Sequence, residues 1–257
     1  MKRVDLNCDM GELPEAIADG TQEALMQCIT SANIACGGHA GDEAMMRTTI
    51  EQALRHNVTI GAHPGYEDRV NFGRIELQLA PEEISASVER QIRALDAIAR
   101  QCGAHTVHVK AHGALYNQAA RDRAIARSIA EGVRRWRAEV ILVGLAGSVM
   151  LDEFHAAGFA TAAEAFADRR YEPDGSLRPR KFRDALLADP EQASAQALQI
   201  VEHATVVASN GTVIPLHART LCLHGDTAGS PAIAAAIRAR LTAANITLIS
   251  LTSDAGR

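Results

Sequence analysis

Short apolar runs alternate along the chain with longer segments in which apolar residues recur at helical spacing. The runs lie near residues 3–8, 31–36, 58–62, 105–110, 140–144, 161–166 and 219–223, with a candidate eighth at 246–251. This alternation is typical of βα units and predicts a parallel sheet. Seven or eight units in a chain of this length fit a closed, TIM-like barrel better than an open sheet. We therefore expect an α/β fold with one (β/α)-barrel domain over residues 1–257.

An open, doubly wound sheet is the alternative architecture, and it should show a G-x-G-x-x-G turn after its first strand. The chain has no such turn. Residues 82–101 repeat apolar side chains at steps of three and four between Pro81 and Gly103, which predicts a long amphipathic helix. Residues 169–192 are polar and rich in Arg, Asp and Pro, so we expect a long connection beside a functional rim.

Two further helices have recognisable starts. Residues 230–244 begin with Ser230, which we expect to be the N-cap, and with Pro231 in the first turn. Ser148 is expected to cap a shorter helix that ends at Gly158.

Polar residues occupy one parity of most predicted strands, and apolar residues occupy the other. Successive side chains of a strand point to opposite faces, so each set shares a face. In strand order, the polar set comprises Asp5, Asn7 and Asp9, then Thr59, Gly61 and His63, then His108, Lys110 and His112, then Glu164 and Asp168 beside Phe166, and finally Thr220, Cys222, His224 and Asp226.

This pattern departs from that of ordinary parallel strands, which are apolar on both faces. Charged groups inside a barrel cost several kcal/mol each unless they pair with one another, a metal or a ligand. The set gathers toward the carboxyl ends of the strands, where barrel enzymes place their chemistry. The glycine-rich loops after the second and third runs each add a histidine, His39 and His63. A single Asp or His could be a satisfied core residue, but the repetition over five strands indicates a functional site.

Composition and charge exclude several classes of protein. With 26 Lys+Arg against 31 Asp+Glu, the net charge is −5, which gives no reason to expect nucleic acid or an anionic membrane as a partner. No apolar run reaches the ~18–20 residues that cross a bilayer. Asp5 interrupts the start of the chain, so we expect no signal peptide. The five cysteines form no C-x-x-C pair and are expected to be reduced core thiols of a cytoplasmic protein.

Several reaction classes lack their sequence marks. The chain has no G-x-S-x-G elbow, no H-E-x-x-H helix and no G-x-x-x-x-G-K-[ST] loop. Carboxylates near imidazoles instead suit acid–base or metal-assisted attack on a carbonyl, with Lys110 stabilising negative charge. A divalent metal is left open, and its candidate ligands are Asp9, His39 and His63.

Ordered blocks over nearly the whole chain resemble the LamB/YcsF family. The first is DLNCDMGE at 5–12, and the others lie at 29–37, 39–42, 60–66, 72–74, 108–110, 112–117, 164, 166–171, 222 and 224–226. The resemblance implies a barrel of the glycoside hydrolase/deacetylase type, usually with seven strands. It also implies ATP-dependent opening of 5-oxo-L-proline to L-glutamate by a 5-oxoprolinase, together with two further subunits, B and C. The ATP site could lie on this chain or on a partner.

The resemblance also implies roles for individual residues. Asp9 or Asp5 would act as base or metal ligand, and Lys110 and His112 would polarise the carbonyl. Arg169 or Arg74 would hold the substrate carboxylate. The remaining expected substrate-binding residues are Asn7, Asn33, His39, His63, Glu164, Asp168, His224 and Asp226. The sequence departs from the family pattern at Leu13, Gly38, Glu43 and Ala111, which leaves the lactam itself open.

Two other functions stay open at this point. The chain could be a stand-alone metal-dependent amidase or deacetylase, which would need no ATP. It could also be a non-catalytic subunit that binds a lactam while its partners perform the chemistry. Whether the chain forms a homo-oligomer is not decided by the sequence.

Overall fold

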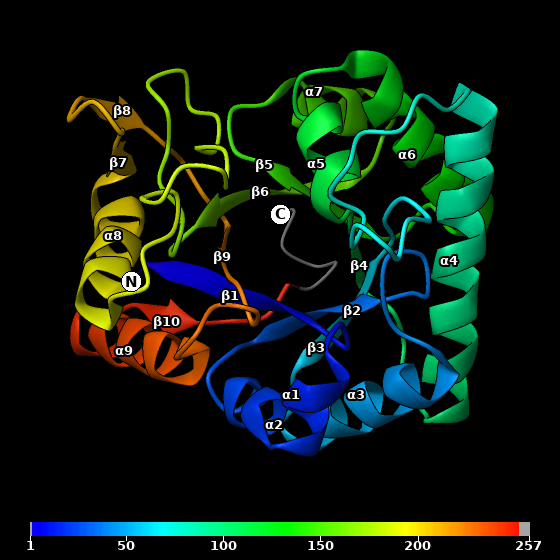
Figure 1. Cartoon of the computed structure of the whole chain (residues 1–257), viewed down its shortest axis with the longest axis horizontal. Helices are drawn as coiled ribbons and strands as arrows, with labels where there is room; N and C mark the ends of the chain where they lie inside the picture. Colours follow the sequence, from blue (N-terminus) through cyan, green and yellow to red (C-terminus); the bar gives the residue numbers. More distant parts are fainter. Residues whose placement is uncertain (1, 252–257) are drawn as a thin grey trace.

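Seven parallel strands form a closed barrel in the computed structural model, which describes residues 2–251 (Figure 1). The ring runs β1-β2-β3-β4-β5-β6-β9, and β9 pairs back onto β1. The strands are β1 (Arg3–Met10), β2 (Ser31–Ala35), β3 (Thr59–His63), β4 (His108–Lys110), β5 (Ile141–Leu145), β6 (Ala160–Phe166) and β9 (Thr220–Leu223). The predicted TIM-like barrel is therefore confirmed, with seven strands in the ring.

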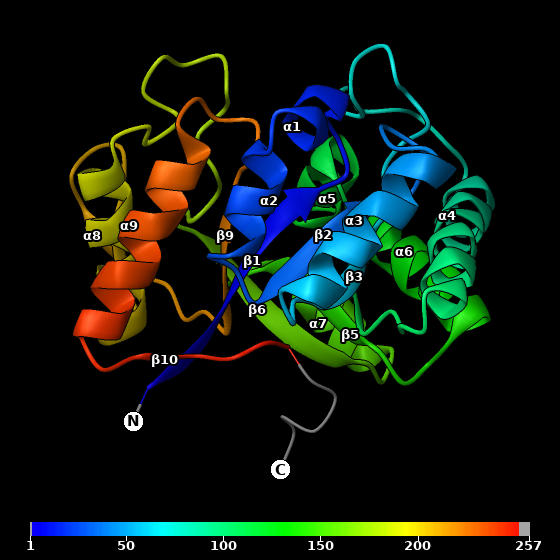
Figure 2. The same cartoon turned by 90° about the horizontal axis from the view of Figure 1, so that it is seen from below.

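Nine described helices lie outside the ring (Figures 1 and 2). They are α1 (Pro14–Ala18), α2 (Thr21–Met26), α3 (Glu43–Arg55), α4 (Pro81–Gln101), α5 (Gly113–Ala119), α6 (Arg123–Trp136), α7 (Val149–Ala156), α8 (Pro190–His203) and α9 (Ser230–Ala243). No helix among the described residues is both long enough and apolar enough to cross a membrane. The cytoplasmic location stays a prediction.

The predicted long helix is α4, whose bounds match the expected ones closely. Its apolar stripe, from Ile84 to Ile98, is buried. The stripe packs against α6, and Gly132 of α6 permits the close approach. A β-carbon at Gly132 would lie 2.5 Å from the carbonyl oxygen of Ser85, so only glycine fits there without movement of the backbone.

Of the two predicted helix caps, Ser230 is wrong and Ser148 is right in position, although its side chain makes no capping hydrogen bond. The N-cap of α9 is Gly229 at φ 76°, and Ser230 is the first helical residue. The Ser230 hydroxyl donates to the carbonyl of Gly225 at 3.0 Å, so the serine ties the helix to the preceding loop instead of capping it. Ser148 does occupy the N-cap position of α7, but its hydroxyl donates to the carbonyl of Leu145 at 2.6 Å. Both serines bond backward to the chain that enters the helix.

The run at 246–251 was a candidate eighth strand, but it does not enter the ring. Only β10 (Thr247–Leu248) pairs, and it pairs with the start of β1. Beyond it, Leu251 is 2% exposed and packs with Ile141, Val143 and Ala162. These three residues come from the first half of β5 and β6, so Leu251 fills the amino-terminal end of the barrel.

The polar connection after β6 contains no helix or strand up to α8, as expected. An antiparallel hairpin that we did not predict, β7 (Thr205–Val207) with β8 (Val213–Pro215), follows α8. Its strands have three residues each, which is too short for a readable alternation of polar and apolar positions. All five cysteines are free, and Cys28 and Cys102 are only partly buried.

Polar side chains fill the upper interior of the barrel, which confirms the parity prediction. Gly61 on β3 shows the packing most clearly, because a β-carbon there would lie 2.0 Å from Nε2 of His108. His108 in turn bonds through Nε2 to Oδ1 of Asn33 at 2.8 Å. Glycine on one strand thus makes room for an imidazole on its neighbour.

Asp5 lies deep in this interior, below the mouth of the barrel. Its Oδ1 accepts hydrogen bonds from Thr30 at 2.7 Å and Ser31 at 2.6 Å, and its Oδ2 accepts one from Thr220. Burial nevertheless raises the pKa of Asp5 to about 6, because desolvation outweighs the hydroxyl donors.

We predict that Asp5 makes the free energy of unfolding depend on pH. Its pKa is higher in the folded chain than in the unfolded one, so folding takes up a proton between about pH 4 and 6. The stabilisation is complete below the unfolded pKa and is lost as pH rises through about 6, a change of roughly 3 kcal/mol. In Asp5→Asn, urea unfolding at pH 4.5 and 7.5 should show a smaller difference between the two values than wild type.

Ser31→Ala provides the opposite check. It removes one donor to the carboxylate, so the difference between pH 4.5 and pH 7.5 should increase. An unchanged pH dependence in Asp5→Asn would contradict the prediction.

Candidate active site

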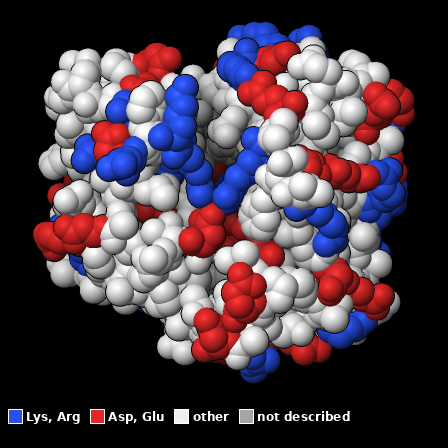
Figure 3. All heavy atoms as spheres, in the orientation of Figure 1, with Lys and Arg blue, Asp and Glu red and all other residues white. Residues whose placement is uncertain are grey.

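A cavity of about 970 Å³ opens at the carboxyl ends of the strands. Figure 3 shows the hollow on this face, with basic side chains on both sides and acidic side chains at its lower end. The loops after β1, β3, β4, β5, β6 and β9 contribute to its wall. Residues 173–180 of the long connection and residues 214–216 complete it. The cavity lies where the predicted polar set converges.

Four side chains meet at one side of the cavity, and we call them the histidine cluster: Glu12, His39, His63 and His112. Oε1 of Glu12 lies 2.9 Å from Nε2 of His39 and 3.1 Å from Nδ1 of His112. Nδ1 of His112 also lies 3.0 Å from Nε2 of His63. The rings of His39 and His112 stack with centroids 3.6 Å apart. The residues come from four separate segments, with His63 at the end of β3 and the other three beyond the ends of β1, β2 and β4, so the cluster exists only in the folded chain.

Burial disfavours the protonated form of the histidines in the cluster. It lowers the pKa of His39 to about 4 and also lowers the pKa of His112. Burial opposes protonation of His63 as well, but the neighbouring Asp9 carboxylate outweighs it and raises the pKa of His63. Burial would raise the pKa of Glu12, yet the two imidazoles bonded to it hold that pKa well below its usual range.

Lys110 joins the cluster to the centre of the barrel. Its Nζ lies 3.0 Å from Oδ1 of Asp9, 2.9 Å from Oε1 of Glu164 and 3.1 Å from Sγ of Cys222. Burial opposes a charge on Lys110, but these neighbours hold its pKa well above the usual value. Glu164 also accepts a hydrogen bond from the Tyr116 hydroxyl at 2.7 Å. The ammonium is therefore held between carboxylates and does not stand free.

His224 is positioned by Asp168. Its Nδ1 lies 3.0 Å from both carboxylate oxygens, and its backbone N–H donates to Oδ2 at 2.8 Å. The ring stacks on Phe166 with centroids 5.5 Å apart. Among residues 2–251, Nε2 of His224 has no hydrogen-bond partner, and the side chain lines the cavity. An imidazole held in this way can pass a proton to or from a bound ligand.

The arginines at the cavity differ in their pairing. Arg74 and Arg180 share the Asp226 carboxylate, at 2.5 and 3.0 Å. Arg169 is only 6% exposed, donates to the carbonyl of Arg178 at 2.7 Å, and leaves Nε without a partner. No described carboxylate lies within ion-pair distance of it. Burial, reinforced by Arg180, lowers the pKa of Arg169 to about 10.

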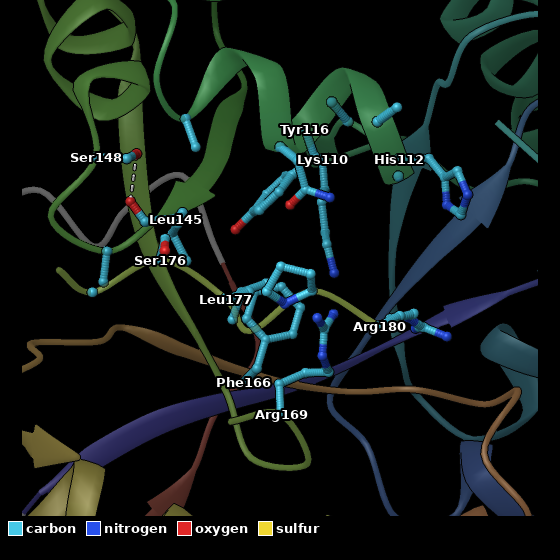
Figure 4. Close-up of a pocket in the computed structure, with 18 of the residues that line it drawn as sticks. Lys110, His112, Tyr116, Leu145, Ser148, Phe166, Arg169, Ser176, Leu177 and Arg180 are labelled. Atoms are coloured by element: carbon cyan, nitrogen blue, oxygen red, sulfur yellow. Dashed lines mark hydrogen bonds between the residues drawn. The ribbon is translucent and has the colours of Figure 1, made fainter. Parts of the chain in front are cut away.

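Figure 4 shows how these groups face the cavity. Lys110 and Tyr116 project from one side, while Phe166 and Arg169 project toward them from the opposite side. The Arg169 guanidinium points into the space between these segments, so an anion bound there would lie close to the Lys110 network.

The structure brings only part of the predicted site to the cavity wall. The predicted residues that line the wall are Asp9, His63, Arg74, Lys110, His112, Arg169, His224 and Asp226. Those behind it are Asn7, Asn33, His39, Glu164 and Asp168, and each bonds to a wall residue. Asp5 belongs to neither group. The expectation that it acts as base or metal ligand is therefore corrected, because hydroxyl groups below the cavity occupy its carboxylate.

Sequence reasoning assigned no role to Glu12, Tyr116, Phe166 or Arg180. Glu12 lies beyond the last residue of β1, after a turn at Gly11 with φ 70°, so strand parity could not place it. Its position two residues past the strand, beside a glycine, was the available signal. Arg180 reaches the cavity from a connection with no periodicity.

Comparisons with known proteins find similar sequences and a similar fold. The model of the LamB/YcsF family matches residues 4–255. A protein of Chloroflexus aggregans, named as the A subunit of 5-oxoprolinase, is 50% identical over 248 residues, covering 96% of this chain and 98% of that one. The lactam utilization protein of Thermus thermophilus has a crystal structure that superposes with a TM-score of 0.90 at 40% identity, covering 97% of this chain and 100% of that one. A family 4 carbohydrate esterase of Streptomyces lividans shares the fold alone, with a TM-score of 0.52 at 10% identity over 100% of this chain and 96% of that one.

Proposed function

Because this chain belongs to the LamB/YcsF family, we propose that it is the A subunit of an ATP-dependent 5-oxoprolinase. The assembled enzyme would open 5-oxo-L-proline to L-glutamate and would include partner subunits B and C. The relatives named as this subunit support the proposal, because their sequences match almost the whole chain.

The observation that carries the proposal is the unpaired Arg169 in the same cavity as a carboxylate–imidazole cluster. The substrate is a small lactam with one carboxylate, and a buried guanidinium without an anionic partner suits that group. With its carboxylate on Arg169, the ring would lie between His224 and Asp9. This orientation exposes the lactam carbonyl to the polar wall.

The reaction then requires water to attack the lactam carbonyl carbon and the bond from carbon to the ring nitrogen to break. Asp9, held by Lys110, would take the proton from the attacking water. His224, oriented by Asp168, would give a proton to the departing ring nitrogen. The opened chain carries one new carboxylate and one new amine, and it is glutamate.

A five-membered lactam is a poor electrophile, so we assign ATP the role of activating it. Transfer of the terminal phosphoryl group of ATP to the carbonyl oxygen, with ADP as leaving group, would make the ring carbon susceptible to water. Cleavage of the bond to the ring nitrogen would then leave an acyl phosphate, and a second water would hydrolyse it to the carboxylate and inorganic phosphate. The chain contains no G-x-x-x-x-G-K-[ST] loop, and we therefore propose that ATP binds a partner subunit.

The test combines the purified chain with subunits B and C of a close relative. We expect ADP release that requires 5-oxoproline and all three proteins. Glutamate should form in an amount equal to the ADP released. If the relative's own counterpart of this chain supports ADP release under the same conditions and this chain does not, the proposal is wrong.

The same experiment separates the two other functions. A stand-alone amidase or deacetylase would cleave an amide without ATP and without partners. A protein that only binds the lactam would keep the partner reaction in Asp9→Ala, with weaker substrate binding, whereas catalytic participation predicts loss of glutamate formation.

A further inference from the structure

The histidine cluster brings four metal-ligating side chains together. Glu12, His39, His63 and His112 each offer a ligand atom, and these atoms all lie within 4.8 Å of one another. The last three residues are buried. Groups that only accept hydrogen bonds repel one another at such distances unless a cation lies between them.

The outer nitrogen of two rings is already committed to backbone. Nδ1 of His63 lies 2.8 Å from the carbonyl oxygen of Lys110, and Nε2 of His112 lies 3.0 Å from that of Phe72. A carbonyl oxygen only accepts, so each of these nitrogens carries the ring hydrogen. In the neutral rings the inner nitrogens, Nε2 of His63 and Nδ1 of His112, therefore carry lone pairs, and a metal ion would take the place of the proton that Asp9 favours on Nε2 of His63. This is how metal-binding histidines are held in proteins, with the far N–H on a carbonyl.

The spacing of the inner atoms also fits a small cation. Nδ1 of His112 is 3.0 Å from Nε2 of His63, and Oε1 of Glu12 is 3.1 Å from the first and 3.8 Å from the second. Four ligands around Zn²⁺ at about 2.0–2.1 Å stand roughly 3.3–3.4 Å apart. The observed distances bracket this value.

The charges around the cluster favour the same ion. The carboxylates of Asp9 and Glu164 share a single ammonium, that of Lys110, and Glu12 faces only imidazoles. The carboxylates therefore exceed the fixed positive charge, and a divalent cation in place of a proton on His63 would balance them. The ring of His39 stacks on that of His112 with the two planes 3° apart, and its Nε2 bonds to Oε1 of Glu12 at 2.9 Å, which leaves His39 to position the carboxylate.

We propose that Glu12, His63 and His112 bind one divalent transition-metal cation of the Zn²⁺ type, with His39 holding Glu12 in place. Two imidazoles and one carboxylate are the donor set that such ions prefer over Mg²⁺ or Ca²⁺. All three ligands line the cavity, so a further coordination position faces the substrate. The inference deepens the proposed function, because a cation there would polarise the carbonyl or activate the attacking water. It replaces the expected set of Asp9, His39 and His63.

The test measures metal binding by the full chain without partners. After purification and removal of metal with a chelator, the protein is titrated with Zn²⁺ against a chromophoric competitor, and metal content is measured by mass spectrometry. Wild type should bind about one Zn²⁺ per chain, and His63→Ala/His112→Ala should bind none at this site. Glu12→Gln, which keeps the side-chain shape, should weaken binding more than tenfold. His39→Ala should weaken it about 10–100-fold.

His105→Ala is the matched control, since His105 is exposed and lies outside the cluster. It should bind Zn²⁺ as wild type does. Co²⁺ should give visible d–d bands in wild type and His105→Ala and none in His63→Ala/His112→Ala. If wild type binds Zn²⁺ no better than the double variant, the metal site does not exist. If it binds but chelation leaves 5-oxoproline turnover with the partners unchanged, the site stands without a role in that reaction. If turnover is absent even with Zn²⁺ bound, the proposed function fails and the site remains.

Discussion

Replacing Lys110 with methionine is expected to lower the free energy of unfolding by about 3–5 kcal/mol. The ammonium is buried between the carboxylates of Asp9 and Glu164, and methionine preserves the length of the side chain but not the charge. The two carboxylates would then remain buried without their cation, a state far less stable than the intact pair. Urea unfolding of wild type and variant at pH 7.5 measures the difference.

A second substitution shows whether the lost charge is responsible. Glu164→Gln in the Lys110→Met background removes one of the stranded carboxylates, so it should restore part of the lost stability. Lys181→Met is the control, because Lys181 is exposed and should change stability by less than about 0.5 kcal/mol. Equal stability of Lys110→Met and wild type would contradict the pairing described here.

Replacing Arg169 with leucine should have the opposite profile, with a large loss of substrate affinity and little loss of stability. A charge-assisted hydrogen bond to a carboxylate contributes about 1.5–3 kcal/mol, so KM for 5-oxoproline should rise roughly 10–100-fold. Stability should stay within about 1 kcal/mol of wild type, because losing the bond to the Arg178 carbonyl is offset by removing an unpaired buried charge. Steady-state kinetics with the partners and thermal unfolding of the chain provide the two measurements.

Arg183→Leu is the matched control, because Arg183 lies in the same connection and is exposed. It should leave KM unchanged. If Arg169→Leu raises KM no more than Arg183→Leu does, the substrate carboxylate binds elsewhere, and the pair Arg74–Arg180 becomes the next candidate.

The barrel could be predicted from the sequence because its strands combine two independent signals. Apolar runs such as 140–144 place the strands, and the polar parity of residues such as Asn7 and Lys110 shows that the interior is hydrophilic. The hairpin β7–β8 was beyond this reasoning, because three-residue strands carry no period.

The site residues that could be predicted are likewise those on or beside the strands. Asp9, His63, Lys110 and His224 were found because they lie on strands or just after them. Asp5 has the same parity as Asp9, yet parity does not give depth, and burial among hydroxyl groups removes it from the cavity. Glu12 and Arg180 enter from turns, whose paths depend on the tertiary structure.

Leu251 closes the amino-terminal end of the barrel interior, where it packs with Ile141, Val143 and Ala162. In the part of the chain that the structure describes, that end is filled. Reactants therefore enter and leave the polar interior by the same opening, which residues 173–180 border. A partner protein that docks over this opening would therefore govern the exchange of water, lactam and amino acid with bulk solvent. A labile activated intermediate could then pass from one protein to the other without being released.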